Sequence, residues 1–250
     1  MRIPSPAVLL DLWEIGSALP MAQRMLLLLG SAQPELSRAL LEEMPLGQRD
    51  AQLMTLREQL FGTQIISVAN CPNCGERLQI TLDTRTLRVA DHASPQPISF
   101  AHASYTVTYR LPNSADLLAL TKVSAGSSQK NVAASRAFLL ERCVQSVQAD
   151  GVAQTLDELP PAVLDAIAAH MAEADPQADI QFALNCPVCG QHWLAAFDIA
   201  TFLWSEIGAW ARRIVRQVHL LASAYGWSQN DILNLSAARR QIYLELIGNG

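Results

Sequence analysis

The chain has 250 residues, of which 50% are hydrophobic and only 16% are charged, and its formal net charge at pH 7 is -5. This length and apolar content support a substantial core and exclude a largely disordered chain. The low and acidic charge argues against a broad electrostatic surface for DNA or RNA.

Residues 1–62 predict an N-terminal helical region. Apolar positions are dense from Ala7 to Leu29, and Pro20 is a natural break, so two short helices are expected there. A small helix over Glu35 to Glu43 and a longer amphipathic one over Gln48 to Phe61 should follow.

A hexapeptide, Asn-Cys-Pro-x-Cys-Gly, occurs at residues 70–75 and again at residues 185–190. Two cysteines spaced C-x₂-C before a glycine are typical of a zinc knuckle, because the short turn directs both thiolates at one tetrahedral ion and glycine relieves the turn. Two knuckles complete one closed site, so we predict one structural zinc per chain. Its predicted ligands are Cys71, Cys74, Cys186 and Cys189. The same pattern also allows two chains of a dimer to share their knuckles.

The similarity between the two copies extends beyond the cysteines. Residues 65–87 align with residues 180–202 at an offset of 115 without gaps, and the stretch after each knuckle alternates between apolar and polar residues. Each copy therefore predicts strand, knuckle and strand. Common zinc ribbons separate their cysteine pairs by about 15–20 residues, whereas 111 residues lie between Cys74 and Cys186. We expect a ribbon with halves at residues 63–90 and 179–199, split by an insertion at residues 91–178.

The insertion predicts one strand and several helices. Residues 105–111 alternate as a strand does, Asn113 or Ser114 can cap a helix over residues 116–123, and a longer amphipathic helix should run from about Lys130 to Gln148. Leu159-Pro160-Pro161 opens a further helix that Asp175-Pro176 closes. A loop is expected at residues 91–97 and a Gly-Ser turn at residues 126–128. Cys143, without a nearby partner, is interpreted as a buried thiol.

Residues 200–250 predict a C-terminal helical region, with a long helix from Thr201 to Ala224 and short helices capped by Ser228 and Ser236. Packing in a core is the default for its aromatic side chains. Trp, Tyr and Arg are also the residue types enriched at interface hot spots. We therefore expect some members of the following set to face a partner: Trp204, Trp210, Arg212, Arg213, Arg216, Tyr225 and Trp227.

The cysteine pairs have two alternative chemistries. A thioredoxin-type redox pair lies at a helix N-terminus, whereas both copies lead into strand-like sequence. A catalytic zinc keeps an open position for water, whereas four thiolates close the site, although His192 could replace one ligand. The other histidines, His92, His102, His170 and His219, show no metal-binding spacing, and no nucleotide-binding or nucleophile motif occurs. We expect no enzyme.

A zinc-ribbon regulator that binds DNA is the rival hypothesis. The segment from Ser228 to Ile247, two short helices with Arg239-Arg240 on the second, could be mistaken for a helix-turn-helix. Its apolar residues favour packing over groove binding.

No long apolar run occurs near the N-terminus, since Met25 to Leu29 is too short for a membrane span or a signal peptide. We expect a soluble cytoplasmic protein. In a reducing compartment, paired cysteines favour metal ligation over disulfides.

Several stretches resemble a known family. They are the runs 198–207, 210–211, 218–222, 224–227 and 231–233, with weaker similarity at 46–50, at the first knuckle and at 110–112. These are similar to the baseplate hub assembly proteins of T-even-type contractile phages, whose relatives occur in prophages and in contractile injection-system gene clusters of bacteria. The similarity is strongest over residues 186–247.

The resemblance implies a non-enzymatic assembly factor, or chaperone, that binds hub or baseplate subunits of a contractile tail in the bacterial or phage-infected cytoplasm. The resemblance supplies no catalytic residue, and it implies a factor that can be absent from the finished particle. Charge and the lack of a long apolar run predict no nucleic acid or membrane partner, and the oligomeric state is left open. The zinc prediction rests on the sequence alone. The expected fold is α+β and mostly helical, with a split zinc ribbon and an inserted strand-helix subdomain.

Overall fold

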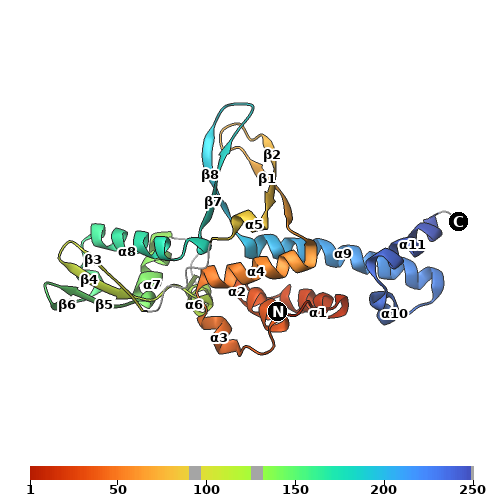
Figure 1. The fold of residues 1–250 in the computed structure, drawn as a ribbon, viewed down its shortest axis with the longest axis horizontal. Coiled ribbons are helices and arrows are strands. Elements are labelled where there is room, and N and C mark those ends of the chain that lie inside the picture. The colour runs from red at the N-terminus through yellow and green to blue at the C-terminus, as the bar shows by residue number, and fades with distance from the viewer. Residues whose placement is uncertain (90–96, 125–131, 249–250) are drawn as a thin grey trace. The chain divides into compact units, whose positions relative to one another are not determined.

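A computed structural model describes residues 1–89, 97–124 and 132–248 of the protein. They form a mixed α+β fold in which helices hold more residues than strands (Figure 1), and they divide into two compact units. The first unit comprises residues 1–34 and 200–250, and the second comprises residues 35–199. His92, the Gly-Ser turn at 126–128, the expected helix start at Lys130 and nearly all of the loop expected at 91–97 lie outside the described residues.

Helices build the first unit. They are α1 (Pro6–Gly16), α2 (Met21–Ala32), α9 (Ile199–Tyr225), whose first residue belongs to the second unit, α10 (Gln229–Asn234) and α11 (Ala237–Gly248). Ser5 caps α1 by accepting a hydrogen bond from the Val8 N–H, and Pro20 separates α1 from α2 as predicted. Ser228 and Asp231 form the expected capping box of α10. Leu10, Ala211, Ile214 and Leu233 form a buried cluster in this unit.

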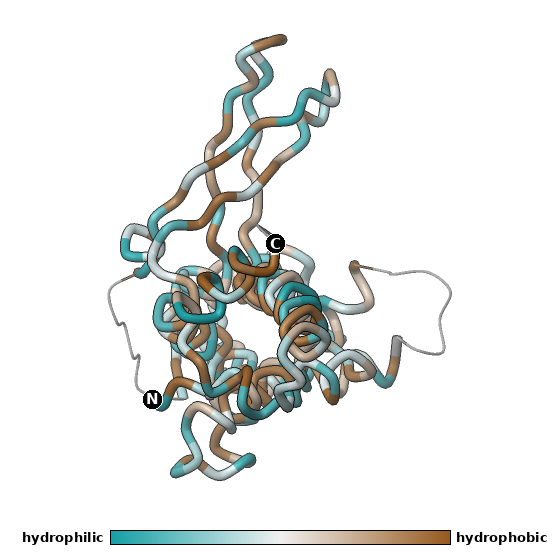
Figure 2. The backbone as a smooth tube through the Cα atoms, turned by 90° about the vertical axis from the view of Figure 1, so that its right-hand side faces the viewer, coloured by the Kyte–Doolittle hydropathy of each residue, from teal (hydrophilic) through white to brown (hydrophobic). Residues whose placement is uncertain are grey.

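The second unit begins with α3 (Arg38–Glu43) and α4 (Leu46–Phe61), close to the helices expected there. Two antiparallel hairpins follow at different points of the chain, β1 (Gln64–Asn70) with β2 (Arg77–Asp83) and β7 (Ile180–Asn185) with β8 (His192–Phe197). Both Figure 1 and the turned view in Figure 2 show the two hairpins side by side. The short helix α5 (Thr84–Leu87) follows β2, as α9 follows β8.

The two hairpins have the same register. Asn70 pairs with Arg77 in the first hairpin, and Asn185 pairs with His192 in the second, so the pairs coincide when the chain is shifted by 115 residues. The strands predicted before and after the cysteine pair of each copy are therefore present.

Successive side chains of a strand point to opposite faces, so every second residue of a hairpin strand lies on its more buried face. Leu78, Ile80 and Leu82 are half-buried on β2, as are Trp193, Ala195 and Phe197 on β8. In β1 the apolar residues divide between the faces, since Ile65 is buried whereas Ile66 and Val68 are 63% and 51% exposed.

The insertion contains more strand than expected. A sheet of order β3-β4-β5-β6 joins β3 (Ile98–His102), β4 (Tyr105–Tyr109), β5 (Val144–Ala149) and β6 (Val152–Gln154). Its helices are α6 (Ser114–Ser124), α7 (Val132–Cys143) and α8 (Pro161–Ala174), with short 3₁₀ turns at Leu156–Glu158 and Pro176–Ala178. The prediction of a single strand was wrong.

The helix expected to reach Gln148 ends at Cys143, because the chain continues as β5 and pairs with β4. Val144 and Val147 are three residues apart, which suits a helical pattern, but Val147 is buried opposite Val107 of β4. The sheet and α8 enclose a core that includes Tyr109, Leu140, Val163 and Ile167. Among the described helices, none combines the length and apolarity needed to cross a bilayer.

Candidate metal centre

The two cysteine turns have matching backbone geometry. The Cys71 N–H donates to the Glu76 carbonyl at 2.8 Å, and the Cys186 N–H donates to the Gln191 carbonyl at 2.9 Å. The N–H of the glycine that ends each hexapeptide, Gly75 or Gly190, donates to the carbonyl of the first cysteine at 2.9 Å. Both glycines have a positive φ, 75° and 72°, a conformation that side chains with a Cβ disfavour.

These turns bring together the four cysteines that the sequence predicts. All four Sγ atoms lie within 4.8 Å of one another. Two contacts are 3.6 Å long, and both link one turn to the other: Cys71 with Cys189, and Cys74 with Cys186. The first cysteine of each turn is buried and the second is exposed. We call this group the four-cysteine cluster.

The cluster fits a tetrahedral ion. Zinc–sulfur bonds of about 2.3 Å place the sulfurs of a tetrahedral site about 3.8 Å apart, close to the shorter contacts here. Four sulfur donors suit zinc. His192 lies at the start of β8 opposite Asn185. Among the described residues, the four-cysteine cluster is the candidate metal site. His192 does not belong to this cluster.

The sulfurs also influence one another's protonation. The Gln191 N–H and the Asn73 side chain lower the pKa of Cys189 to about 6. The Glu76 N–H also favours the Cys74 thiolate, but desolvation and the neighbouring sulfurs raise the pKa of Cys74 to about 12. A bound cation would remove this conflict, because it stabilises all four thiolates at once.

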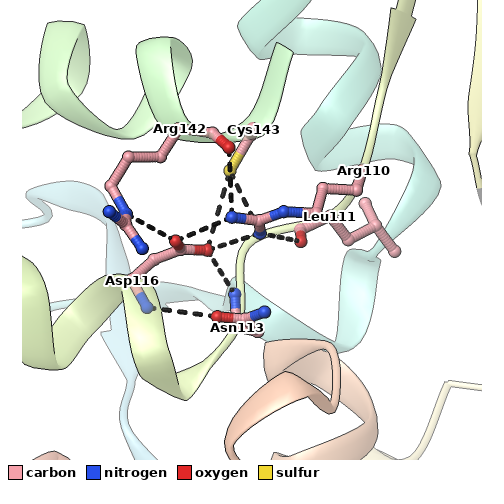
Figure 3. A network of polar contacts seen from close by, with 6 residues as sticks. All are labelled: Arg110, Leu111, Asn113, Asp116, Arg142 and Cys143. Carbon is pink, nitrogen blue, oxygen red and sulfur yellow. Dashed lines mark hydrogen bonds and ion pairs between the residues drawn. The ribbon is translucent and has the colours of Figure 1, made fainter. Parts of the chain in front are cut away.

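A second polar cluster, which sequence reasoning missed, surrounds the buried Asp116 (Figure 3). Arg110 donates to both carboxylate oxygens of Asp116, at 2.6 and 2.9 Å, and Arg142 Nε donates to Oδ1 at 2.7 Å. Asn113 and Asp116 exchange hydrogen bonds at the start of α6, so the cap expected at Asn113 is present. Together with Cys143, whose Sγ lies 3.8 Å from Asp116 Oδ2, these residues form what we call the Asp116 network.

The Asp116 network keeps a buried carboxylate ionised inside the second unit. Burial by itself raises the pKa of Asp116, but hydrogen bonds from Arg110 and Arg142 hold it below its usual value. Burial and the Asp116 carboxylate raise the pKa of Cys143 to about 12, so Cys143 is the buried thiol that the sequence predicted. The capping signal at Asn113 was visible in the sequence, whereas the pairing of Arg142 with Asp116 depends on tertiary packing.

A third feature is Asp50, a buried carboxylate on α4 that forms an ion pair with the neighbouring Arg49. Arg49 NH2 lies 2.7 Å from Asp50 Oδ1. Burial nevertheless outweighs the attraction of Arg49, and with repulsion from Asp198 and Asp175 it raises the pKa of Asp50 to about 6. Asp175 also accepts a hydrogen bond from the Gly47 N–H at 2.9 Å, in the first turn of α4.

The residues expected to face a partner differ in exposure. Trp204 is only 9% exposed, with the Arg24 guanidinium 4.9 Å from its ring centre, and Trp210 is half-buried. Tyr225 is 38% exposed and stacks on the half-buried Trp227, 4.7 Å between ring centres. The exposed arginines of the set are Arg212, Arg213 and Arg216 on α9.

The fold and the cluster define an α+β protein in which two similar hairpins, distant in sequence, could hold one metal ion between them. A comparison with protein families matches residues 29–204 to the family described as T4 bacteriophage base plate protein. Because the match covers most of the chain, the protein belongs to this family, which indicates a structural or assembly role in a phage baseplate. The searches of curated proteins and of solved structures found no match.

The family match and the resemblance seen in the sequence cover different stretches. The match includes both cysteine turns but ends at residue 204, so most of the stretch with the strongest resemblance, residues 186–247, lies beyond it. Membership of a T4-type baseplate family is confirmed, and the narrower assignment to hub assembly is a proposal.

Proposed function

We propose that the protein is a non-enzymatic assembly factor, or chaperone, for the baseplate or central hub of a contractile phage tail or a related injection system. The family match over residues 29–204 carries this proposal. The resemblance of residues 186–247 to hub assembly proteins supports the narrower role. It would act in the bacterial or phage-infected cytoplasm, and the hub or baseplate subunits are its expected partners.

In this proposal the four-cysteine cluster binds one structural zinc ion per chain, with Cys71, Cys74, Cys186 and Cys189 as ligands, and the two hairpins are the halves of a split zinc ribbon. The sulfur distances and the matched turns support this interpretation. Four protein ligands leave no position for a reacting water. The zinc would join two segments of the chain, and its binding free energy would become folding free energy.

Partner binding is assigned to the helices of the first unit. Arg212, Arg213, Arg216 and Tyr225 are the exposed members of the predicted set, and Trp227 is half-buried beside Tyr225. Trp204 and Trp210 contribute mainly by holding α9 in place, since both pack within the unit.

The rival proposal of a DNA-binding regulator is weakened by Arg240. Its side chain is buried and its NH1 donates to the Leu235 carbonyl at 2.6 Å, so Arg239 is the member of the pair that remains exposed. A single exposed arginine on α11 is a poor basis for reading a major groove.

Co-purification tests the proposed function. A tagged full-length chain, expressed together with the baseplate and hub genes that neighbour its own, should retain at least one of those subunits. A strain lacking the chain should accumulate unassembled hub or baseplate, and expression in trans should restore assembly. Normal assembly in the deletion strain together with no retained subunit contradicts the proposal. Mass spectrometry of purified particles shows whether the chain stays in them.

A further inference from the structure

The long helix α9 has two faces of different character. Ile207, Ala211, Ile214 and Leu221 are buried, and Ala211 and Ile214 pack in the core cluster of the first unit. Successive residues of an α-helix are about 100° apart around the axis, which places the opposite half of the circumference toward solvent. Among the exposed residues on or at the edge of that outward half are Arg212, Arg213, Val215, Arg216, His219 and Leu220, and we call these six the basic face.

The basic face differs in charge from the rest of the protein. In sequence the first unit holds seven arginines and five acidic residues, a formal charge of +2, whereas the second unit holds 11 basic and 18 acidic residues, a charge of -7. Residues 207–225 of α9 include three arginines and no carboxylate. This stretch therefore has a formal charge of +3, whereas the rest of the first unit sums to -1.

The three arginines of the basic face are also unpaired. Across residues 1–89, 97–124 and 132–248, no ion pair or hydrogen bond involves the guanidinium of Arg212, Arg213 or Arg216. Other arginines of the first unit are engaged within it, such as Arg24, which donates to the Leu19 carbonyl, and the buried Arg240. The basic face thus retains its full capacity to bind carboxylates.

Exposed apolar side chains flank these cations on the helix. Val215 is 49% exposed and Leu220 is 42% exposed, and both lie on the same half of the helix as the arginines. A surface that binds nucleic acid through phosphates gains little from exposed aliphatic groups. Arginine interspersed with aliphatic side chains instead resembles the composition of protein interfaces, where apolar burial supplies affinity and charge supplies specificity.

We propose that the basic face docks an acidic segment of a protein partner, one whose carboxylates alternate with apolar side chains. Arg212 and Arg216 are one turn apart and can each pair with a carboxylate, while Val215 and Leu220 are covered by the partner's apolar groups. This inference rests on the proposed function and deepens it, because it gives the chemistry by which a baseplate or hub subunit is recognised.

Fluorescence anisotropy with a defined probe tests the inference. The probe is a labelled amphipathic peptide whose one face alternates Glu and Leu, and its control is the same peptide with Lys for Glu. The full-length chain should bind the Glu peptide, and raising the salt from about 0.05 M to about 0.3 M should weaken binding about tenfold through screening. The double variant Arg212→Glu/Arg216→Glu should lose about tenfold or more in affinity.

A matched variant controls for net charge. Arg2→Glu/Arg239→Glu changes the charge by the same amount in the same unit, at exposed positions outside the basic face, and should bind the Glu peptide as the wild type does. Equal binding of the Lys peptide, equal loss in both double variants, or tighter binding of duplex DNA or anionic vesicles than of the Glu peptide would each overturn the inference.

The same variants separate this inference from the proposed function. If the wild-type chain retains baseplate subunits and Arg212→Glu/Arg216→Glu retains them equally well, the assembly role stands and the basic face is not its docking site. If the chain binds the Glu peptide through the basic face but retains no baseplate or hub subunit, the inference about the face stands and the assembly role fails.

Discussion

The four-cysteine cluster and the Asp116 network both join segments of the second unit that are far apart in sequence, but they do so with different chemistry. The cluster brings the thiols of two hairpins together, and under the proposed function a cation from solution holds them there. The Asp116 network connects the end of β4, the start of α6 and the end of α7 with charges that the chain itself supplies. The first connection should therefore respond to metal supply, and the second to mutation and to acid.

Of the changes that distinguish the two connections, removal of the metal should have the largest effect. Structural zinc sites of this kind contribute about 10–16 kcal/mol of apparent binding free energy, so Cys71→Ser or a strong chelator should loosen the hairpins and leave the network intact. Elemental analysis should find one zinc per chain in the wild type and almost none in Cys71→Ser. Cys143→Ser is the matched control, since Cys143 is buried but outside the cluster, and it should retain the metal. Full zinc content in Cys71→Ser would contradict the assignment.

Removing the buried charge of Asp116 should break the other connection. Asp116→Asn leaves Arg110 and Arg142 without their carboxylate, and loss of one member of a buried ion pair costs about 3–5 kcal/mol. Urea denaturation should show this loss with zinc content unchanged. Arg142→Gln, at a side chain that is 36% exposed, should cost clearly less. Equal stability of Asp116→Asn and the wild type would show that the network contributes nothing.

Acid should affect the two buried carboxylates in opposite directions. The folded pKa of Asp116 lies below its unfolded value, so its contribution is present above the unfolded pKa and is lost as the pH falls through the folded pKa. The folded pKa of Asp50 is raised to about 6, so its ionisation opposes folding at neutral pH, and this penalty disappears as the pH falls from about 6 to about 4. Asp50→Asn should flatten the rise in stability between pH 6 and pH 4, a difference of about 1–3 kcal/mol in unfolding free energy. An unchanged pH profile would contradict this.

The smallest effect is expected at the glycines of the cysteine turns. Gly75 has a φ of 75° with open space where a Cβ would lie, so Gly75→Ala introduces backbone strain alone, about 1–2 kcal/mol. Gly75→Asn should cost less, because Asn tolerates this conformation better. Thermal unfolding of the zinc-loaded variants measures the difference, and equal costs for Ala and Asn would show that backbone strain is not the cause.

The cysteine turns were predictable from sequence because the residues that form each turn are adjacent in the chain and the same pattern occurs twice. The C-x₂-C spacing and the glycine after it determine each turn, and the 115-residue offset already pairs every position of one hairpin with its counterpart in the other. The expectation that the two hairpins converge followed from the four ligands that one tetrahedral ion would take.

The sheet of the insertion was not predictable in the same way. The spacing of Val144 and Val147 suits a helix as well as a strand. The strand forms because Val147 pairs with Val107, forty residues earlier in the chain. The exposed Ile66 and Val68 likewise could not be distinguished from core residues by hydrophobicity. The Asp116 network combines a local cap with a distant arginine, so its sequence signal gave only the cap at Asn113.

The separation of the two cysteine turns also sets an order of events during synthesis. Residues 71 and 74 leave the ribosome more than a hundred residues before residues 186 and 189, and at about 5–20 residues per second this delay is on the order of ten seconds. Throughout that interval the nascent chain holds only half of the cluster, two thiols that cannot enclose an ion tetrahedrally. The sheet and helices of the insertion emerge within the same interval, so they can fold before the second hairpin arrives.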